Sequence, residues 1–286
     1  MQTVTQLEML RNAVNALRAG GKTIALVPTM GALHEGHLTL VREAKKLADH
    51  VAVSIFVNPT QFGPNEDLDA YPRQLAEDSA MLEGEGTALL WAPTVEEMYP
   101  EGFASSISVS GVSEGFCGAN RPGHFDGVAI VVCKLFQQVL PDVACFGEKD
   151  WQQLAVIRAM ARDLDLTRPY AREIIGIPTV READGLAMSS RNRYLDAENR
   201  AAAATLPREM REAIARIEDG QNVTRTLAAL EDALLGAGFS SVDYADLADA
   251  SSLQVLTELG SRPARLLVAA RIGGTRLIDN MPVGAG

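Results

Sequence analysis

Ile24-Ala-Leu-Val-Pro-Thr-Met-Gly-Ala-Leu-His-Glu-Gly-His37 is the stretch from which the fold of this chain can be read. Its first four residues are apolar with a β-branched residue at each end, which is typical of a buried parallel strand. Pro28 is expected to end this strand because it has no N–H to give to a ladder. Apolar residues then recur at helical spacing, so a helix is expected to begin near His37. A strand, a glycine loop and a helix N-terminus in this order direct backbone N–H groups at an anion, usually a phosphate.

Two of the four histidines, His34 and His37, lie on this loop. They could be ordinary loop and cap residues. A zinc protease would need His-Glu-x-x-His, whereas these two are three apart and Gly36 lies between them, so zinc is disfavoured. His-x-Gly-His after the first strand resembles the signature of the nucleotidylyltransferase superfamily. In that superfamily the imidazoles bind the phosphates of ATP and stabilise charge as the α-phosphorus is attacked.

The composition is that of an ordinary soluble globular protein. The chain has 286 residues, of which 47% are hydrophobic and 22% charged, and a formal net charge of −11. This negative charge argues against a nucleic acid or an anionic membrane as partner. The three cysteines form no Cys-x-x-Cys pair, and no apolar stretch is long enough to span a bilayer. We therefore expect a cytoplasmic protein.

Strand and helix patterns alternate through the first part of the chain. Strands are expected over 24–27, 51–57, 87–91, 143–146 and 172–177, and helices over 4–19, 73–83, 128–140 and 151–164. This alternation predicts a parallel sheet with right-handed crossovers, and ligands beyond the carboxyl ends of its strands. Residues 93–123 are irregular, with one strand expected over 106–109, and indicate a binding loop or a subunit contact.

The composition changes after about residue 182. Alanine-rich, charged helices are expected over 196–217 and 223–237, followed by strands over 243–247, 264–270 and 275–278. The predicted fold class is therefore α/β. A Rossmann-like parallel-sheet domain that binds the nucleotide, residues 1–182, precedes a smaller α+β C-terminal domain, residues 183–286.

Over essentially its whole length the sequence resembles the pantoate–β-alanine ligase family. The stretches that carry the resemblance are Val27–His37, Phe56–Gly63, Tyr71–Arg73, Gly123–Gly127, Phe146–Asp150, Met188–Arg191 and Arg276–Asn280. The resemblance implies a reaction of pantothenate and coenzyme A biosynthesis. The carboxylate of (R)-pantoate attacks ATP to give pantoyl adenylate and pyrophosphate, and β-alanine then displaces AMP. It also implies Mg²⁺ with the ATP, and a homodimer.

The resemblance also implies which residues form the site. His37, with His34 and Lys149, would be catalytic. Gln61 and Gln153 would bind pantoate, and Gln61 would also bind β-alanine. The residues that would bind ATP are Met30, Gly31, Ala32, Leu33, His34, Glu35, Gly36, His37, Gly147, Glu148, Lys149, Asp150, Val180, Met188, Ser189, Ser190 and Arg191. The protein ligands of the metal stay unknown, with Glu77 and Asp78 as acidic candidates.

Several of these residues also have a plainer interpretation. Lys149 could be a solvated turn lysine, and Ser189 and Ser190 could simply cap a helix. Arg121 and His124 are expected to shape the long loop or a dimer contact. The cysteines are expected to be small core residues.

Two other functions compete with the ligase. A nucleotidylyltransferase with a phosphate-bearing acceptor predicts basic residues near the 58–64 loop, and that loop has none. A catalytically silent nucleotide-binding regulatory module predicts the loss of His37, Lys149 or Arg191, and all three are present. The ligase is therefore favoured.

Overall fold

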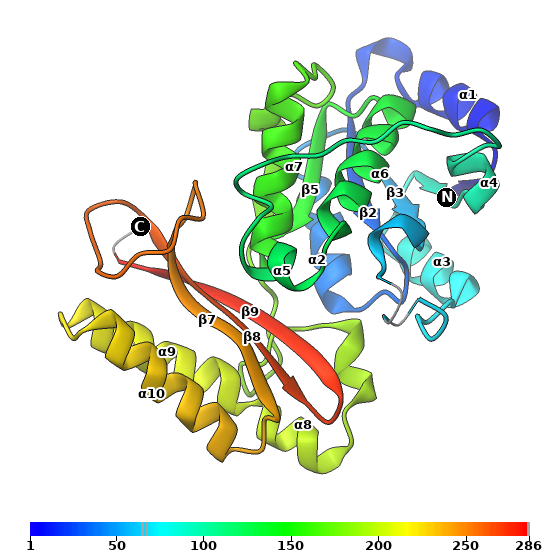
Figure 1. Cartoon of the computed structure of the whole chain (residues 1–286). Coiled ribbons are helices and arrows are strands. Elements are labelled where there is room, and N and C mark those ends of the chain that lie inside the picture. The colour runs from blue at the N-terminus through cyan, green and yellow to red at the C-terminus, as the bar shows by residue number, and fades with distance from the viewer. Residues whose placement is uncertain (64–65, 67, 285–286) are drawn as a thin grey trace. The chain divides into compact units, whose positions relative to one another are not determined.

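The computed structural model describes residues 1–63, 66 and 68–284, and these form two compact units (Figure 1). The first unit comprises residues 1–110, 121–148 and 153–178. The second comprises residues 111–120, 149–152 and 179–286. Within the part of the chain that the structure describes, every helix is too short or too polar to cross a membrane.

A six-stranded parallel sheet, in the order β1-β4-β3-β2-β5-β6, forms the centre of the first unit. Its strands are β1 (Gln2–Val4), β2 (Ile24–Thr29), β3 (His50–Ile55), β4 (Leu89–Trp91), β5 (Val143–Gly147) and β6 (Ile174–Ile177). The helices connecting them are α1 (Leu7–Leu17), α2 (Glu35–Ala44), α3 (Leu75–Gly84), α4 (Val95–Met98), α6 (His124–Val139) and α7 (Trp151–Asp163). The predicted Rossmann-like class is confirmed.

The strand order reverses beside β2. From β2 the chain adds β3 and β4 on one side and later β5 and β6 on the other. In open parallel sheets, ligands bind outside the carboxyl ends of the strands at such a reversal. The segments that follow β2 and β5 are therefore the ones that the topology places at the expected ligand crevice.

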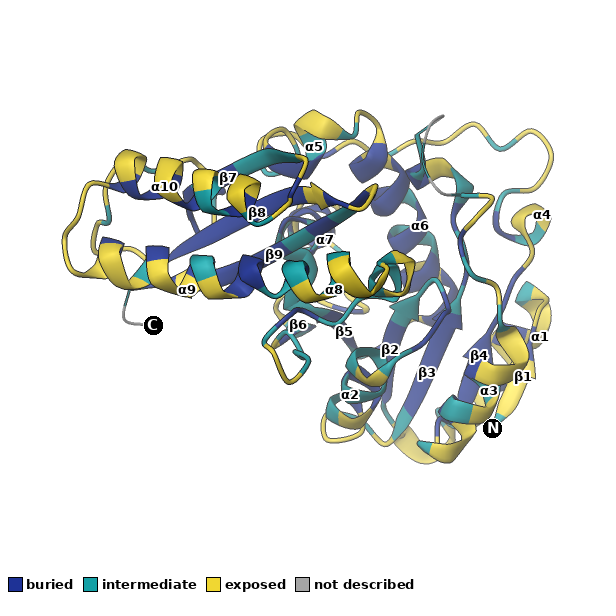
Figure 2. Cartoon of the chain, turned by 90° about the horizontal axis from the view of Figure 1, so that it is seen from below, coloured by how far each residue is buried: buried dark blue, intermediate teal, exposed yellow. Residues whose placement is uncertain are grey.

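The second unit is an antiparallel sheet covered by helices. Its strands are β7 (Ser241–Asp249), β8 (Ala264–Ile272) and β9 (Thr275–Val283), and its helices are α5 (Phe116–Asn120), α8 (Ala197–Ala203), α9 (Thr205–Glu218) and α10 (Val223–Gly236). Apolar side chains of α9 and α10 pack on apolar side chains of the strands, while the opposite faces of both helices are exposed (Figure 2). The predicted α+β character of this part of the chain is thus confirmed.

Pro28 does not end its strand, contrary to the prediction. β2 continues to Thr29 in register with β3. The backbone groups of successive β2 residues point alternately towards β3 and towards β5. The carbonyl of Thr29 accepts from the N–H of Phe56, next to β3, and the carbonyl of Ile24 accepts from the N–H of Asp142, next to β5. Pro28 therefore faces β5, which pairs with β2 only at Ala25 and Leu26. The missing N–H costs no ladder bond there.

Three further expectations about elements are corrected. Val4 belongs to strand β1 and not to the first helix, because three residues are too few to show an alternating pattern. Residues 106–109 alternate as expected for a strand but join no ladder. The predicted helix over 196–217 is divided at Ala204 into α8 and α9. The ring of Pro207 would clash with the carbonyl of Ala203 in a continuous helix, which accounts for the division.

The cysteines are thiols placed in or near the core, as expected. Cys145 is fully buried on β5, and this burial raises the pKa of its thiol to about 12, with a smaller contribution from the charge of Glu43. Burial also raises the pKa of Cys133. Thiols that hold their protons this firmly are poor nucleophiles.

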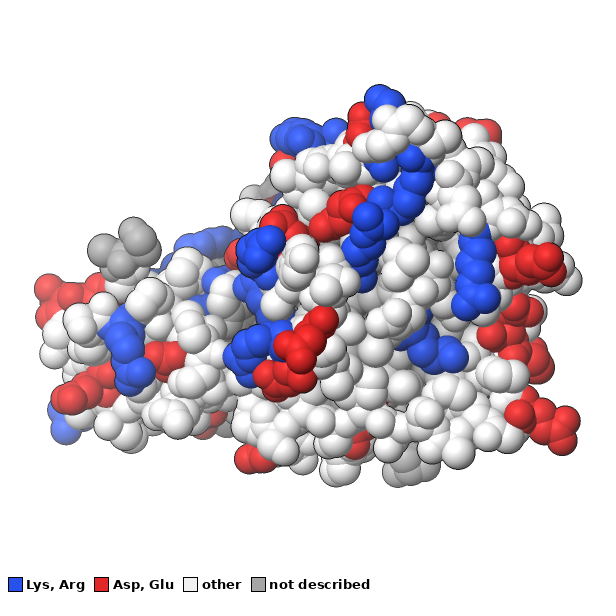
Figure 3. All heavy atoms as spheres, turned by 90° about the horizontal axis from the view of Figure 1, so that it is seen from above, with Lys and Arg blue, Asp and Glu red and all other residues white. Residues whose placement is uncertain are grey.

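Charged side chains on the face shown in Figure 3 occur in small groups of either sign, with uncharged atoms covering most of the surface between them. On this face, and among the described residues, the basic side chains do not merge into one positive field.

Gln138 supplies a testable contact in the core of the first unit. Its Oε1 atom accepts a hydrogen bond at 3.0 Å from the indole N–H of Trp91, a side chain that is fully buried. We predict that Gln138→Leu lowers the free energy of unfolding by about 1–3 kcal/mol, because the indole N–H is left unpaired away from water. Gln137→Leu is the matched control, since Gln137 is exposed on the same helix. Equal stability of the two variants in urea unfolding would contradict this account.

Candidate active site

His34 and His37 fasten the start of helix α2 through their rings. The Nδ1 atom of His34 accepts from the backbone N–H of Gly36 at 3.1 Å, and the Nδ1 atom of His37 accepts from the N–H of His34 at 3.3 Å. His34 is the N-cap, so the helix begins at Glu35, two residues before His37. The two ring centroids are 4.1 Å apart. A neutral imidazole that accepts at Nδ1 carries its proton on Nε2. Both rings are thereby fixed in the Nε2–H tautomer.

Asp78 fixes the loop between β2 and these histidines. Its two carboxylate oxygens accept the backbone N–H groups of Ala32 and Leu33, each at 2.9 Å, and Asp78 is only 1% exposed. Gly31 has a φ of 82°, and a Cβ atom there would lie 3.0 Å from the carboxylate. Ala32 also has a positive φ, 51°, which is uncommon for a residue with a side chain. The carboxylate thus stabilises a backbone conformation that the chain would otherwise avoid.

Gln61 is brought to this loop from the next strand along the chain. It ends η2 (Pro59–Gln61), whose N-cap is Asn58. The Nε2 atom of Gln61 donates to the sulfur of Met30 at 3.0 Å, and its Oε1 atom accepts from Asn58 at 3.2 Å. Two predicted site residues that are far apart in sequence, Met30 and Gln61, are therefore in contact.

Helix α6 packs directly on η2. Asn58 donates to the carbonyl of Gly127 at 2.9 Å, and a Cβ atom on Gly127 would lie 2.4 Å from the carbonyl oxygen of Thr60. His124 contacts the carbonyl of Gln61 at 2.8 Å, and Arg121 lies 2.9 Å from the same imidazole. Arg121 and His124 thus support the backbone around Gln61, a segment outside the 93–123 loop that they were expected to shape.

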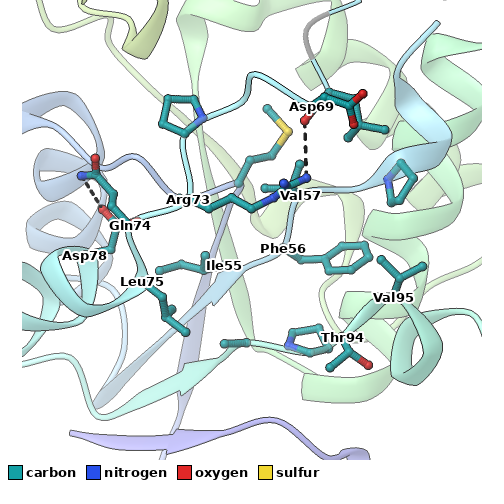
Figure 4. A pocket seen from close by; sticks show the side chains of 17 residues that line it. Ile55, Phe56, Val57, Asp69, Arg73, Gln74, Leu75, Asp78, Thr94 and Val95 are labelled. Carbon is teal, nitrogen blue, oxygen red and sulfur yellow. Dashed lines mark hydrogen bonds between the residues drawn. The ribbon is translucent and has the colours of Figure 1, made fainter. Parts of the chain in front are cut away.

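A cavity of about 400 Å³ borders the same loop, at the carboxyl ends of β3 and β4 (Figure 4). Its lining is mostly apolar and includes Ile55, Phe56, Leu75 and Val95, with the Arg73 side chain extending towards Val57. Met30 and Gly31 also line it. The loop between β2 and α2 therefore has Asp78 and an open apolar space next to it.

Lys149 lies in the turn that follows β5. This turn is η3 (Glu148–Asp150), and α7 begins directly after it. The carbonyl of Lys149 accepts from the side chain of Asn280 at 2.9 Å. Gln153, in the first turn of α7, is half-buried in the first unit, whereas Lys149 is grouped with the second.

The neighbouring Gln152 binds the main chain of another segment, a role that the sequence does not predict. It is 5% exposed, accepts from the N–H of Cys117 at 3.0 Å, and donates to the carbonyls of Val112 and Gly115 at 3.1 and 2.8 Å. It therefore fastens the segment 111–120 to the second unit. An amide next to another amide gives no pattern by which this could be predicted.

Residues 179–191 form an arm that ends in the predicted Ser-Ser-Arg loop. Val180 and Met188, both predicted to bind ATP, are joined by a hydrogen bond of 3.0 Å from the N–H of Met188 to the carbonyl of Val180. The hydroxyl of Ser189 accepts from the N–H of Arg191 at 3.2 Å and caps η5 (Ser190–Tyr194). The plainer interpretation of Ser189 as a cap is thus correct. This cap is compatible with the expected binding of an ATP phosphate by the loop.

The acidic candidates for a metal site, Glu77 and Asp78, differ in their surroundings. Glu77 is exposed, and Asp78 already accepts two backbone N–H groups. Among the described residues, no three His, Cys, Asp or Glu side chains come together in a way that could hold a metal ion. The described part of the chain therefore lacks a protein cage for a cation.

We predict that Asp78→Asn lowers the free energy of unfolding by about 1–3 kcal/mol. The amide group turns one of the two acceptors into a donor, so a buried backbone N–H of the loop is left unpaired. Glu77→Gln makes the same chemical change at the neighbouring, exposed position and is expected to shift stability by less than about 0.5 kcal/mol. Denaturant unfolding of both variants tests this, and a loss of equal size in the two would refute the anchoring role.

Comparison with known proteins places the whole chain in one group. The family model described as "Pantoate-beta-alanine ligase" matches residues 2–282. A relative from Novosphingobium aromaticivorans, named pantothenate synthetase, is 69% identical over 99% of both chains. One with the same name from Sphingopyxis alaskensis is 62% identical over 99% of this chain and 100% of that protein.

Solved structures agree with the sequence comparison. Pantothenate synthetase from Thermus thermophilus has a TM-score of 0.91 to this chain, with 46% identity, and covers 98% of this chain and 99% of its own. A pantoate–β-alanine ligase from Francisella tularensis, in complex with β,γ-ATP and β-alanine, has a TM-score of 0.83 and 33% identity, and covers 100% and 99%. Both units of the chain lie within these matches.

Proposed function

The chain belongs to the pantoate–β-alanine ligase family, and we propose that it joins the two substrates through a pantoyl adenylate. The carboxylate of (R)-pantoate attacks the α-phosphorus of ATP, which forms the acyl–phosphate bond and expels pyrophosphate. The amine of β-alanine then attacks the acyl carbon, and AMP leaves with the bonding electrons and one former carboxylate oxygen. The observation that carries this proposal is the histidine pair fixed at the carboxyl end of β2.

The tautomer of these histidines suits the first step. Because Nδ1 of each ring accepts a backbone N–H, the Nε2–H group is the one that donates to a phosphate oxygen. We assign this role to His37 and His34, with His37 nearest to the charge that develops at the α-phosphate. Donors fixed in advance at such a position stabilise the transition state without reorganising during the reaction. The N-terminus of α2 adds its positive dipole end to the same loop.

Uncharged amides suit the pantoate. The carboxylate has to remain nucleophilic, and a tight ion pair would weaken it as a nucleophile. We propose that Gln61 and Gln153 hydrogen-bond pantoate and that Gln61 also contacts β-alanine. The amide of Gln61 is oriented by Asn58 and by Met30, so its position is set before the substrates bind.

Cations and hydroxyl groups suit the leaving pyrophosphate. The net charge of the chain is −11, so a triphosphate has to be met by locally placed positive charge. We propose that Lys149 binds the triphosphate as a catalytic cation, and that Gly147, at the end of β5, and the turn residues Glu148 and Asp150 contact the adenine nucleotide of ATP. Val180 and the 188–191 loop complete the ATP contacts in this proposal. Arg191 offers a fork of N–H donors that matches a phosphate group.

We predict that His37→Ala reduces the rate of pyrophosphate release from ATP and pantoate by about a hundredfold or more, because one fixed donor to the developing charge is lost. The matched control is His50→Gln. His50 is the first residue of β3, at the opposite end of the sheet from the ligand crevice. Near-normal turnover of His37→Ala would remove this residue from the mechanism, and comparable losses in both variants would point to a general effect on folding.

We propose that Mg²⁺ enters as part of the ATP substrate. The described residues form no cation cage, so phosphate oxygens and water would supply most of the ligands, as is common for this ion. We predict that excess EDTA stops pyrophosphate release and that added Mg²⁺ restores it, while the melting temperature of the protein without ATP stays the same. Full activity in EDTA would refute the requirement. A drop in melting temperature would instead indicate a cation bound by the protein itself.

A homodimer and a cytoplasmic location complete the proposal. The family resemblance suggests the dimer, and the three thiols suit a reducing compartment. Sedimentation velocity at working concentration measures the assembly, and a single species of 30.6 kDa would exclude the dimer.

A further inference from the structure

We propose that two adjacent residues of β9, Asp279 and Asn280, position the two segments of the second unit that bind ATP. These segments are the turn around Lys149 and the arm 179–191. The inference rests on the proposed function, since it assigns no ligand contact to β9 itself. Asp279 and Asn280 are positioning residues, which act on the nucleotide through other groups.

The side chain of Asn280 binds the main chain of the turn around Lys149. Its Nδ2 atom donates to the carbonyl of Lys149 at 2.9 Å, and its Oδ1 atom accepts from Nε of Arg265 at 2.8 Å. Asn280 is 3% exposed, so both bonds are shielded from water. A hydrogen bond to the main chain fixes the path of the turn while leaving the ammonium group of Lys149 available for other contacts.

The other side of the turn is fixed by the same group of residues. The guanidinium carbon of Arg265 lies 3.7 Å from the ring centroid of Trp151, which follows Lys149 by two positions. The indole N–H of Trp151 donates to the carbonyl of Ala250 at 2.9 Å. Asn280 and Arg265 thus contact the chain on both sides of Asp150, at Lys149 and at Trp151. Asn280 and Arg265 themselves lie on the paired strands β9 and β8.

Asp279 holds the arm through Arg181. Two hydrogen bonds of 2.7 and 2.9 Å join the guanidinium to the carboxylate, whose side chain is completely buried. Arg181 also donates to the carbonyl of Gly185 at 3.0 Å, and its backbone bridges to Ala187. The arm is therefore closed on itself and tied to β9 immediately before the 188–191 loop.

These polar residues stand out in the strand that carries them. Leu277, Met281 and Val283 of β9 are buried and apolar. A buried ion pair costs desolvation and is a weak source of stability compared with apolar residues of the same size. Asp279 binds the arm through Arg181, and Asn280 binds the turn through the carbonyl of Lys149 while also accepting from Arg265 of β8. Their geometry therefore suits the orientation of these two segments as well as the packing of the sheet.

The test for Asn280 is steady-state kinetics of Asn280→Leu. We expect KM for ATP to rise about tenfold or more, since the turn loses its main-chain bond, while KM for β-alanine stays within about twofold. Asn280→Asp keeps an acceptor for Arg265 but has no donor for Lys149, so it should show the same pattern, and it replaces Asn280→Leu if that variant fails to fold. Thr275→Val, a buried change on the same strand, is the control and should alter neither constant.

A double variant separates positioning from a general structural role. If Asn280 acts through Lys149, then Lys149→Ala/Asn280→Leu should be no more impaired towards ATP than Lys149→Ala alone. The inference would be overturned if the losses in kcat/KM for ATP of the two single variants multiplied in the double variant. It would also be overturned if both Asn280 variants showed normal ATP kinetics while Lys149→Ala was impaired. Normal kinetics of Lys149→Ala itself would instead overturn the proposed function of Lys149.

Asp279 is tested by removing both buried charges together. Arg181→Met/Asp279→Leu leaves no unpaired ion, so the fold should be retained with a melting temperature close to that of the unchanged protein. We expect kcat/KM for ATP to fall about tenfold, with KM for β-alanine unchanged. A stable double variant with unaltered ATP kinetics would show that the ion pair does not position the arm.

Discussion

The loop between β2 and α2 depends on side-chain acceptors for its backbone N–H groups. A parallel sheet and a following helix both leave such groups unpaired where they meet. Asp78 accepts those of Ala32 and Leu33, and the rings of His34 and His37 accept those at the start of the helix. The bonds to His34 and His37 also select the tautomer of both rings, so the folding of the loop and the phosphate binding proposed for it depend on the same contacts.

The second unit uses the same strategy with another scaffold. Buried polar groups of β9 bind the main chain of the Lys149 turn and the guanidinium that closes the arm 179–191. In both units the segments expected to meet the triphosphate are irregular, and each is fixed by a side chain from a regular element. If these segments bind the triphosphate as proposed, a main chain that is fixed before the substrate arrives reduces the reorganisation that the reaction requires.

Periodicity in the sequence was enough to predict the parallel sheet, the second unit and the loop of His34 and His37. It could not predict bonds between distant segments. An acidic residue on a helix gives no sign of which backbone it will meet, so the sequence offers Asp78 only as a metal candidate and Asn280 only as part of a family motif. The effect of Pro28 is equally hidden in the sequence, since it depends on how far β5 extends beside β2. The residues expected to bind substrates came from the resemblance to a family and not from the pattern of the chain.

The adenylate route is the central claim, and single-turnover release of pyrophosphate from ATP and pantoate tests it most directly. Without β-alanine, we expect a burst of about one pyrophosphate per active site that then stops, because the adenylate stays bound. Adding β-alanine should make the release continuous, with AMP appearing at the same rate. Pyrophosphate that appears only when β-alanine is present, or a release of inorganic phosphate in its place, would contradict attack by the pantoate carboxylate on the α-phosphorus.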